Sequence, residues 1–238
     1  MPSYKLLLTA SGTGSRLGEL TKDTNKALVP VNGRATVSYV LDSYAKDIPV
    51  VVTLGYLGDQ VKDFLLSEYP DRKFEFVTVD PFIGEGSSLL YSMRSAKALL
   101  QCPFIFHACD TIVLEAVPPP TEDWVAGYLT EPSAIDIAQY GSHTVVDGYI
   151  TEIQSKGAAR FDSIHIGMTG IHSYESFWDA VEEVYLNDPA DQSLGDVPVV
   201  ERMSAQGTKF KWIPFRTWLD TGNIPALQEA ERLLRALV

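Results

Sequence analysis

Apolar and polar residues alternate along the first half of the chain in blocks that indicate strands and helices in turn. Short, mostly apolar runs are typical of buried strands, and they occur at 4–9, 49–54, 74–79 and 104–107. Between them, helical spacing of apolar residues predicts helices at 36–44, 59–69 and 87–100. Such an alternation over residues 1–115 favours an α/β fold, a parallel sheet with helices on both faces in three layers.

The second half of the chain has a different pattern. After a proline-rich break at 117–120, short apolar or alternating runs predict strands at 124–129, 143–146, 149–153 and 164–171. Helices are expected at 174–185 and 194–204, a strand at 209–213, and a last helix that begins after Asp220 and runs to the C-terminus. We therefore expect a single domain over 1–238, in which 116–238 adds a small β-rich lid to the half formed by 1–115.

Composition and charge restrict the partners of this domain. The chain has 238 residues, 45% of them hydrophobic, which is enough to bury a core. The net charge of −12 repels nucleic acids and anionic membranes, so we expect neither as a partner. An anionic substrate would need local cationic side chains and a divalent cation.

Three further features concern the state and location of the chain. Cys102 and Cys109 lie in or beside an apolar stretch, which favours buried free thiols over a disulfide. No signal peptide precedes the first apolar run, and no apolar stretch reaches the roughly 20 residues of a membrane span. We therefore expect a cytoplasmic protein.

A glycine-rich turn follows the first predicted strand and carries the first candidate chemistry. It reads Ala10-Ser11-Gly12-Thr13-Gly14-Ser15-Arg16-Leu17, and Lys26 follows closely. Small residues let the backbone approach a phosphate, and Arg16 and Lys26 add cations. A P-loop would need a lysine directly after the last glycine, and a dinucleotide fingerprint would need a third glycine at Leu17. Neither is present.

Two acidic residues and a second glycine turn also lie where α/β proteins build their sites. Asp110 follows the fourth predicted strand, where a buried carboxylate needs a cation partner. Asp220 precedes the last helix, as a metal ligand or as the N-cap of that helix. The turn Gly84-Glu85-Gly86-Ser87-Ser88 leads into a predicted helix, whose N–H groups can face a ligand.

The run from Gly12 to Val31 resembles the signature of the sugar-phosphate nucleotidyltransferases, approximately Gly-x-Gly-x-Arg-Leu, Thr, then Lys-x-Leu-x-Pro-Val. The matching residues are Gly12, Gly14, Arg16, Leu17, Thr21, Lys26, Leu28, Pro30 and Val31, whereas Asn25 replaces the usual proline. The resemblance implies the Rossmann-like mixed sheet of the nucleotide-diphospho-sugar transferases. It also implies a nucleotide-binding half at 1–115 and an acceptor-binding half at 116–238. A homodimer is compatible with the resemblance.

The resemblance also implies roles for individual residues. Arg16 and Lys26 would act on the phosphates, and Asp110 and Asp220 would bind Mg²⁺. The nucleotide-binding residues would be Ala10, Ser11, Gly12, Thr13, Gly14, Asp80, Gly86 and Ser87. Lys156, Thr169 and Trp218 would face the acceptor. The expected reaction transfers a nucleoside monophosphate from a nucleoside triphosphate to a phosphorylated acceptor and releases pyrophosphate.

The acceptor region departs from the family pattern. Ser155 stands where the family has a sugar-binding glutamate, and Ile166 where it has an asparagine. A sugar phosphate remains the first expectation, and a non-sugar acceptor such as phosphocholine is the alternative. A quaternary amine would need an aromatic cage, for which Tyr140, Tyr149, Trp178 and Trp218 are available. Ala10-Ser11-Gly12 resembles the Ala-Ala-Gly start of relatives that use CTP or UTP, so we expect a pyrimidine nucleotide, CTP first.

Two rival functions fit the sequence less well. A nucleotide-sugar glycosyltransferase would need an Asp-x-Asp element, which Asp110-Thr111-Ile112 does not supply. A catalytically inactive homologue would have lost one of Arg16, Lys26, Asp110 or Asp220, and all four are present.

Overall fold

The computed structural model describes residues 4–130, 136–154 and 156–236. Within these residues the dominant feature is a nine-stranded mixed sheet with the strand order β5-β4-β1-β6-β11-β8-β12-β10-β9. The strands, including four that lie outside this sheet, are β1 (Lys5–Ala10), β2 (Pro30–Val31), β3 (Arg34–Ala35), β4 (Val50–Leu54), β5 (Phe74–Thr78), β6 (Phe104–Ala108), β7 (Thr111–Val113), β8 (Trp124–Tyr128), β9 (Ser142–Val146), β10 (Tyr149–Gln154), β11 (Ser163–Ile171), β12 (Lys211–Phe215) and β13 (Trp218–Asp220).

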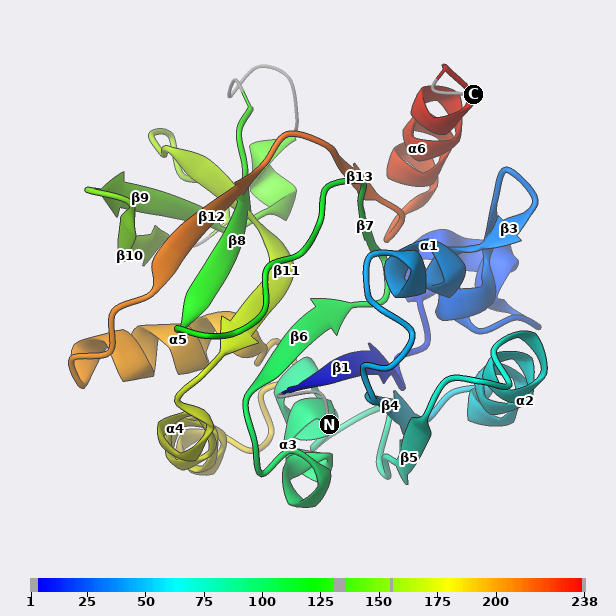
Figure 1. Ribbon diagram of the computed structural model, residues 1–238, viewed down its shortest axis with the longest axis horizontal. Helices are drawn as coiled ribbons and strands as arrows, with labels where there is room; N and C mark the ends of the chain where they lie inside the picture. Colours follow the sequence, from blue (N-terminus) through cyan, green and yellow to red (C-terminus); the bar gives the residue numbers. More distant parts are fainter. Residues whose placement is uncertain (1–3, 131–135, 155, 237–238) are drawn as a thin grey trace.

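Helices lie on both faces of this sheet (Figure 1). The α-helices are α1 (Thr36–Asp42), α2 (Gly58–Glu68), α3 (Leu89–Ser95), α4 (Tyr174–Asn187), α5 (Asp196–Ala205) and α6 (Ile224–Ala236). Short 3-10 helices occur at η1 (Ser15–Thr21), η2 (Lys26–Leu28), η3 (Lys97–Leu99) and η4 (Ile137–Gln139). None of the helices in the described residues is long and apolar enough to cross a membrane.

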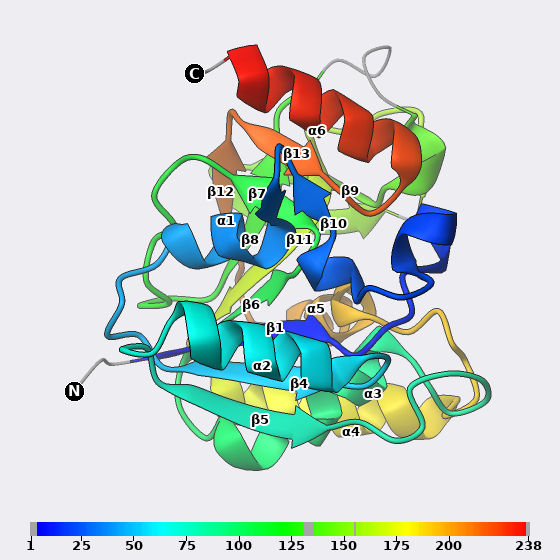
Figure 2. The same cartoon turned by 90° about the vertical axis from the view of Figure 1, so that its right-hand side faces the viewer.

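Strand β1 shows why the fold has three layers. Its residues alternate between the two faces of the sheet: Leu6 and Leu8 join the core formed with α1 and α2, whereas Leu7 joins the core formed with α3, α4 and α5. All three leucines are fully buried. Figure 2 shows α2 on one side of β4 and β5, with α3 and α4 on the other. A strand buried on both faces reads as a continuous apolar run, as the sequence predicts.

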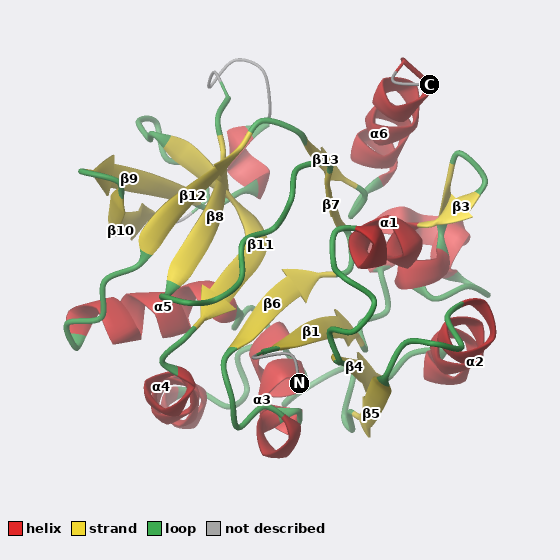
Figure 3. Cartoon of the chain, in the orientation of Figure 1, coloured by secondary structure: helices red, strands yellow, loops and turns green. Residues whose placement is uncertain are grey.

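The strands of the second half extend this same sheet, which the sequence did not reveal. β11 runs antiparallel to β6 and pairs on its other side with β8, and β12 then pairs parallel with β8 (Figure 3). The β9–β10 hairpin, expected as part of the lid, occupies the far edge of the sheet. One mixed sheet therefore continues from the first half into the second, and the carboxyl ends of β1 and β6 lie side by side within it.

A smaller core lies beside the sheet and supports the candidate site. It contains Leu17 from η1, Ile112 from β7, Leu219 from β13 and Leu227 from α6. The pairs β2–β3 and β7–β13 are too short to have been predicted from periodicity. Through this core the last helix of the chain packs against the segment that follows the first strand.

The structure confirms most of the expected elements, with boundaries shifted by one to three residues in most cases. The predicted helix at 87–100 divides into α3 and η3, and it begins after Ser88, whose hydroxyl accepts the N–H of Tyr91. Cys102 and Cys109 are free, as expected. The N-cap prediction for Asp220 is wrong: the side chain of Asn223 accepts the N–H of Ala226 at the start of α6.

Candidate active site

The glycine-rich turn follows β1 and leads into η1. Gly14 adopts a left-handed backbone conformation with φ of 67°, which a residue with a side chain rarely adopts. A Cβ atom at Gly14 would also lie 2.8 Å from the Cβ of Lys26 and 2.9 Å from a methyl group of Thr21. The glycine therefore lets this turn pack directly against the segment that carries Lys26.

Asn25, the residue that departs from the family pattern, fixes the same two segments. Its fully buried side chain donates to the carbonyl oxygens of Ala10 and Tyr56 and accepts the N–H of Ala27. A proline at this position could make none of these side-chain bonds. Asn25 therefore holds these segments by three side-chain hydrogen bonds, where the family's proline would only restrict the backbone.

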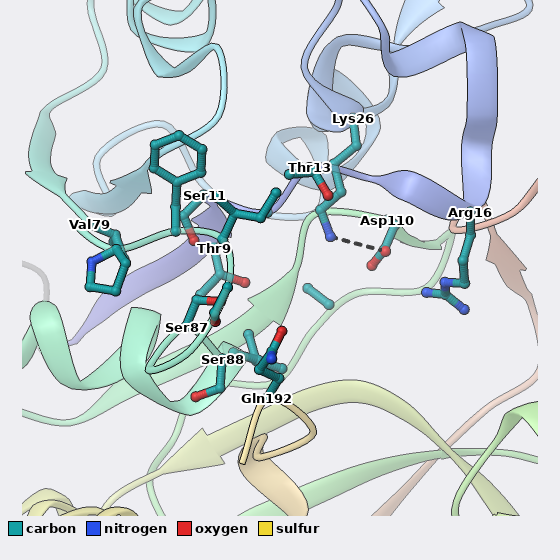
Figure 4. A pocket seen from close by; sticks show the side chains of 17 residues that line it. Thr9, Ser11, Thr13, Arg16, Lys26, Val79, Ser87, Ser88, Asp110 and Gln192 are labelled. Carbon is teal, nitrogen blue, oxygen red and sulfur yellow. Dashed lines mark hydrogen bonds and ion pairs between the residues drawn. The ribbon is translucent and has the colours of Figure 1, made fainter. Parts of the chain in front are cut away.

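A cavity of about 420 Å³ opens at the carboxyl ends of β1 and β6. Ser11, Gly12, Thr13, Arg16, Lys26 and Asp110 line it, all of them expected from the sequence. Figure 4 shows Lys26 and Asp110 facing each other in one part of the cavity, with Ser87, Ser88 and Gln192 in another. One region of the cavity is therefore charged, and the other offers hydroxyl and amide groups.

Asp110 and Asp220, which are far apart in sequence, meet because β7 pairs with β13. Asp220 lies opposite Thr111 in this pairing, and both the backbone N–H and the hydroxyl of Thr221 donate to the carbonyl oxygen of Asp110. A Cβ atom on Gly222 would lie 3.0 Å from Asp220 Oδ1, 3.2 Å from Asp110 Oδ2 and 3.0 Å from Arg16 Nη2. Two carboxylates and one guanidinium thus surround a single small residue.

The charged side chains of Lys26 and Asp110 interact strongly in this cluster. Lys26 Nζ lies 3.3 Å from Asp110 Oδ2, and the two side chains are only 21% and 17% exposed. Burial opposes the charge of each group, yet their mutual attraction outweighs it, so the pKa of Lys26 is raised and that of Asp110 is lowered. Both groups are therefore charged at neutral pH. Burial also raises the pKa of the neighbouring Cys109 to about 11, so its thiol stays protonated.

Asp220 lies in a different environment from Asp110. Burial raises its pKa and the charge of Asp110 adds to this effect, although a hydrogen bond from the Tyr140 hydroxyl, 2.6 Å from Asp220 Oδ2, opposes them. Two carboxylates in this position repel each other unless a cation lies between them. Oxygen ligands of this kind suit Mg²⁺, which usually takes one or two carboxylates together with water and substrate phosphates. Within the described residues no cluster of three or more His, Cys, Asp or Glu side chains offers a fuller metal site.

Some predicted residues do not line the first cavity, among them Ala10 and Gly14 of the glycine-rich turn itself. Asp80 does not line the cavity, although its neighbours Val79 and Pro81 do, and Gly86 lines a separate shallow surface depression. Lys156 lies in an exposed turn whose next residue, Gly157, bonds to the carbonyl of Ile137. Ser155, the expected replacement of the sugar-binding glutamate, lies outside the described residues.

Thr169, predicted to face the acceptor, is fully enclosed in β11. Its hydroxyl donates to Asp196, which also bonds to His165 at 2.9 Å. This buried cluster holds the start of α5, and Leu194 just before it accepts the N–H of Leu90 in α3. The Thr169 hydroxyl is therefore already bonded inside the fold, to Asp196. Position within a strand pattern could not show which face of β11 it occupies, because β11 contains a register shift between His165 and Thr169.

Phe82 and Gln192 are among the residues that line the first cavity but were not predicted from the sequence. Phe82 lines the cavity close to Gly55. A Cβ atom on Gly55 would lie 2.7 Å from the Cβ of Phe82. Gln192 reaches the cavity from the loop before α5. Phe82 lies two residues before the glycine turn that starts at Gly84, and it could have been inferred from that position. Gln192 carries no signal, because its loop is brought in only by tertiary packing.

A second cavity, of about 380 Å³, lies on the other side of Asp220. Trp218, expected at the acceptor, lines it together with Tyr128 and Tyr140. The other two residues considered for an aromatic cage lie apart from it. Trp178 is packed in the core against Phe104, and Tyr149 is on β10 at the edge region of the sheet.

Comparisons with known proteins agree with this architecture, although no family model matches the chain. A CMP-5'-(3-aminopropyl)phosphonate synthase of Streptomyces rubellomurinus is 28% identical over 65% of this chain, which spans 26% of that protein's length. The structure of CTP:phosphocholine cytidylyltransferase from Streptococcus pneumoniae aligns with a TM-score of 0.76 at 18% identity, covering 98% of this chain and all of that one. A UDP-glucose pyrophosphorylase complexed with UDP-glucose aligns over the full length of both chains with a TM-score of 0.80 at 15% identity.

The structural neighbours, like the curated relatives, are nucleotidyltransferases and pyrophosphorylases, which bears out the resemblance found in the sequence. The chain therefore has the mixed α/β fold of the nucleotide-diphospho-sugar transferases.

Proposed function

We propose that the protein is a Mg²⁺-dependent nucleotidyltransferase that moves a nucleoside monophosphate from a nucleoside triphosphate to a small phosphorylated acceptor. The observation that carries this proposal is the convergence of Arg16, Asp110 and Asp220 around Gly222, beside the ion pair of Lys26. Cations and carboxylates in one cleft fit the transfer of a phosphoryl-type group between two anionic substrates, which must be held together against their own repulsion.

In the proposed reaction an oxygen of the acceptor phosphate attacks the α-phosphorus of the nucleotide. The new P–O bond forms as the bond between the α-phosphorus and the bridging oxygen breaks, and pyrophosphate leaves with that oxygen. The attacking oxygen is already anionic, so the site needs no general base. His107 fits this account, because burial lowers its pKa to about 4 and its ring is bonded to Tyr44 and Thr111 inside the sheet.

The side chains of this site have separate tasks. Arg16 and Lys26 neutralise the phosphates, and the ion pair with Asp110 keeps the Lys26 ammonium directed into the cavity. Asp110 and Asp220 would hold Mg²⁺, which supplies positive charge for the transferred group when it is bound. The cavity region lined by Phe82, Ser87 and Gln192 would receive the base and the sugar of the nucleotide.

A cytidine nucleotide is the proposed donor. The start of the glycine-rich turn favours CTP or UTP, and two of the similar proteins are named for CMP or CTP. For the acceptor we favour a compound other than an ordinary hexose phosphate. The family's hydroxyl-binding asparagine position holds Ile166, which is buried and apolar.

A screen of pyrophosphate release tests this function. Purified protein is incubated with Mg²⁺, one of the four common nucleoside triphosphates, and one acceptor from a panel of sugar phosphates and phosphorylated amino alcohols. We expect release that requires both substrates and is greatest with CTP. The Asp110→Asn variant serves as the matched inactive control. Absence of acceptor-dependent pyrophosphate release across the panel, from folded protein, contradicts the proposal.

A further inference from the structure

The second cavity lies next to the proposed reaction centre but differs from the first in its walls. Asp220 and its neighbour Trp218 line it, and Asp220 also approaches Asp110 and Arg16 around Gly222. A small acceptor whose phosphate lies at that cluster would therefore extend its other end into the second cavity. The chemistry of the second cavity then selects the acceptor.

Three aromatic rings form a corner in this cavity. The centroid of the Trp218 ring lies 5.6 Å from that of Tyr128, with 51° between the ring planes, and 5.1 Å from that of Tyr140, with 84° between the planes. Rings at such steep angles present several surfaces to one compact group. A positively charged group gains from each ring face that it contacts, and from Trp most of all.

The charged side chains that line the second cavity all have the same sign. They are Asp136, Asp220 and Glu229, and no Lys or Arg occurs among the described residues that line it. The first cavity, in contrast, is lined by Arg16 and Lys26. Arg232, outside this lining, pairs with Glu229, so the excess negative charge of the cavity comes from Asp136 and Asp220. This charge favours a cation over a phosphate in the second cavity, so the ammonium and phosphate ends of an acceptor would prefer different cavities.

The amide groups of the cavity are already engaged with one another. Gln139 donates to Asp136 and accepts from Asn223, whose oxygen caps α6. Tyr140 likewise uses its hydroxyl on Asp220. Sugar hydroxyls would have to displace these bonds or remain without partners, which costs binding free energy. An ammonium group that contacts the ring faces displaces none of these bonds, and it would share Glu229 with Arg232, which pairs with that carboxylate at 2.6 Å.

We infer that the acceptor carries an ammonium group, and that Tyr128, Tyr140 and Trp218 with Glu229 form its binding site. This inference rests on the proposed nucleotidyl transfer, which sets the phosphate end of the acceptor at Asp110 and Asp220. The ammonium group is either quaternary, as in a choline ester, or primary, as in an aminoalkyl compound. Tyr140 connects the two ends, because its ring is one wall of the cavity and its hydroxyl bonds to Asp220.

Calorimetric binding measurements test the charge preference without relying on turnover. The ligands are phosphocholine, phosphoethanolamine, the uncharged-head isostere 3,3-dimethylbutyl phosphate, and glucose 1-phosphate, each with a non-reactive CTP analogue bound. We expect at least one ammonium ligand to bind about 10-fold or more tightly than the isostere. Comparison of the first two ligands distinguishes a quaternary from a primary ammonium. Equal affinity for the isostere, or tightest binding of glucose 1-phosphate, overturns the inference.

Two variants locate the preference in this cavity. Trp218→Leu should bring the ratio between the ammonium ligand and the isostere close to one, and Glu229→Gln should reduce it several-fold. Glu231→Gln, on the same helix but lining a different surface with Arg235, should leave the ratio unchanged. Glu229 is exposed, so its variant should keep the fold even if Trp218→Leu does not. An unchanged ratio in Glu229→Gln and in folded Trp218→Leu overturns the inference.

The same samples separate this inference from the proposed function. If ammonium ligands bind selectively but no pyrophosphate is released from any nucleotide, the transferase proposal fails and the cavity assignment stands. If pyrophosphate is released most rapidly with a sugar phosphate and the isostere binds as well as phosphocholine, the transferase proposal stands and the ammonium assignment fails.

Discussion

The two cavities near Asp220 differ in their walls. The first cavity is lined by three stretches of the first half, 9–26, 79–89 and 108–110, together with Gln192. The second cavity draws on β8, η4, β13 and α6, which are spread over about 100 residues of the chain. The first cavity offers backbone groups and the cations Arg16 and Lys26, whereas the second offers rings and carboxylates. Both cavities are assembled by the fold, but much of the first is built from two recognisable glycine turns, whereas the segments that line the second share no motif.

The cations of the first cavity should give the largest effect. Arg16→Ala or Lys26→Ala should lower kcat/KM by about 100-fold or more, because each removes charge that stabilises the transition state. Lys22→Ala is the matched control, since Lys22 lies in the same region but is 68% exposed and pairs only weakly with Glu19 at 3.8 Å. Steady-state kinetics with CTP and the preferred acceptor make the comparison. Near-wild-type kcat/KM in both variants would contradict the assignment of the turn.

The cluster shared by the two cavities should control the metal dependence. Chelation of divalent cations should abolish turnover, and Asp220→Asn should raise the Mg²⁺ concentration for half-maximal rate by about 10-fold or more, because it removes one anionic oxygen ligand. The measurement is a Mg²⁺ titration of pyrophosphate release at saturating substrates. Full activity after exhaustive chelation would exclude the metal role of Asp110 and Asp220.

A side chain that lines only the first cavity should affect the binding of the nucleotide and not that of the acceptor. Phe82 lines the cavity and has 36% of its surface exposed, so its ring is available to a base. Phe82→Ala should raise the KM for CTP by about 10-fold, in the range observed when a base loses an aromatic partner. The KM for the acceptor should not change. An equal rise in both KM values would show that the two cavities are not independent.

A further effect concerns stability rather than activity, with one histidine from each half. Burial lowers the pKa of His107 to about 4 and that of His143 to about 3, below the value of about 6.5 in an unfolded chain. Between these values the unfolded chain binds more protons, so the free energy of unfolding falls as the pH falls. From pH 7 to pH 5 each histidine should account for a loss of up to about 2 kcal/mol. Denaturant unfolding at several pH values measures this loss, and a flat profile would contradict the buried neutral state.

The fold was predictable from sequence where the pattern was long enough. β1, β4 and α2 could be inferred from apolar runs and helical spacing, because each has a whole face to bury. The three-residue strands β7 and β13 could not, although their pairing is what brings Asp220 to Asp110. The convergence of these two residues was expected from the resemblance to a family, and the structure supplies its physical cause.

The candidate site shows the same division. Arg16, Lys26 and the turn residues 11–13 were expected because they stand in one motif, and they line one cavity. Thr169 and Lys156 were assigned to the acceptor from the resemblance, and neither lines the two cavities. Thr169 bonds to Asp196 instead, and the placement of the turn at 156–157 depends on a tertiary contact with Ile137. The positions of Tyr128 and Glu229 in a cavity could not be predicted from the sequence, because the residues beside them there come from other segments of the chain.

The most direct test of the account is a phosphorus NMR time course with CTP, Mg²⁺ and phosphocholine or phosphoethanolamine. We predict that pyrophosphate appears in an amount equal to that of the acceptor consumed. Two coupled phosphorus signals should appear with it, from a new diphosphate that joins the cytidine to the acceptor. Appearance of inorganic phosphate with unchanged acceptor, or of no new diphosphate at all, would contradict nucleotidyl transfer between the two cavities.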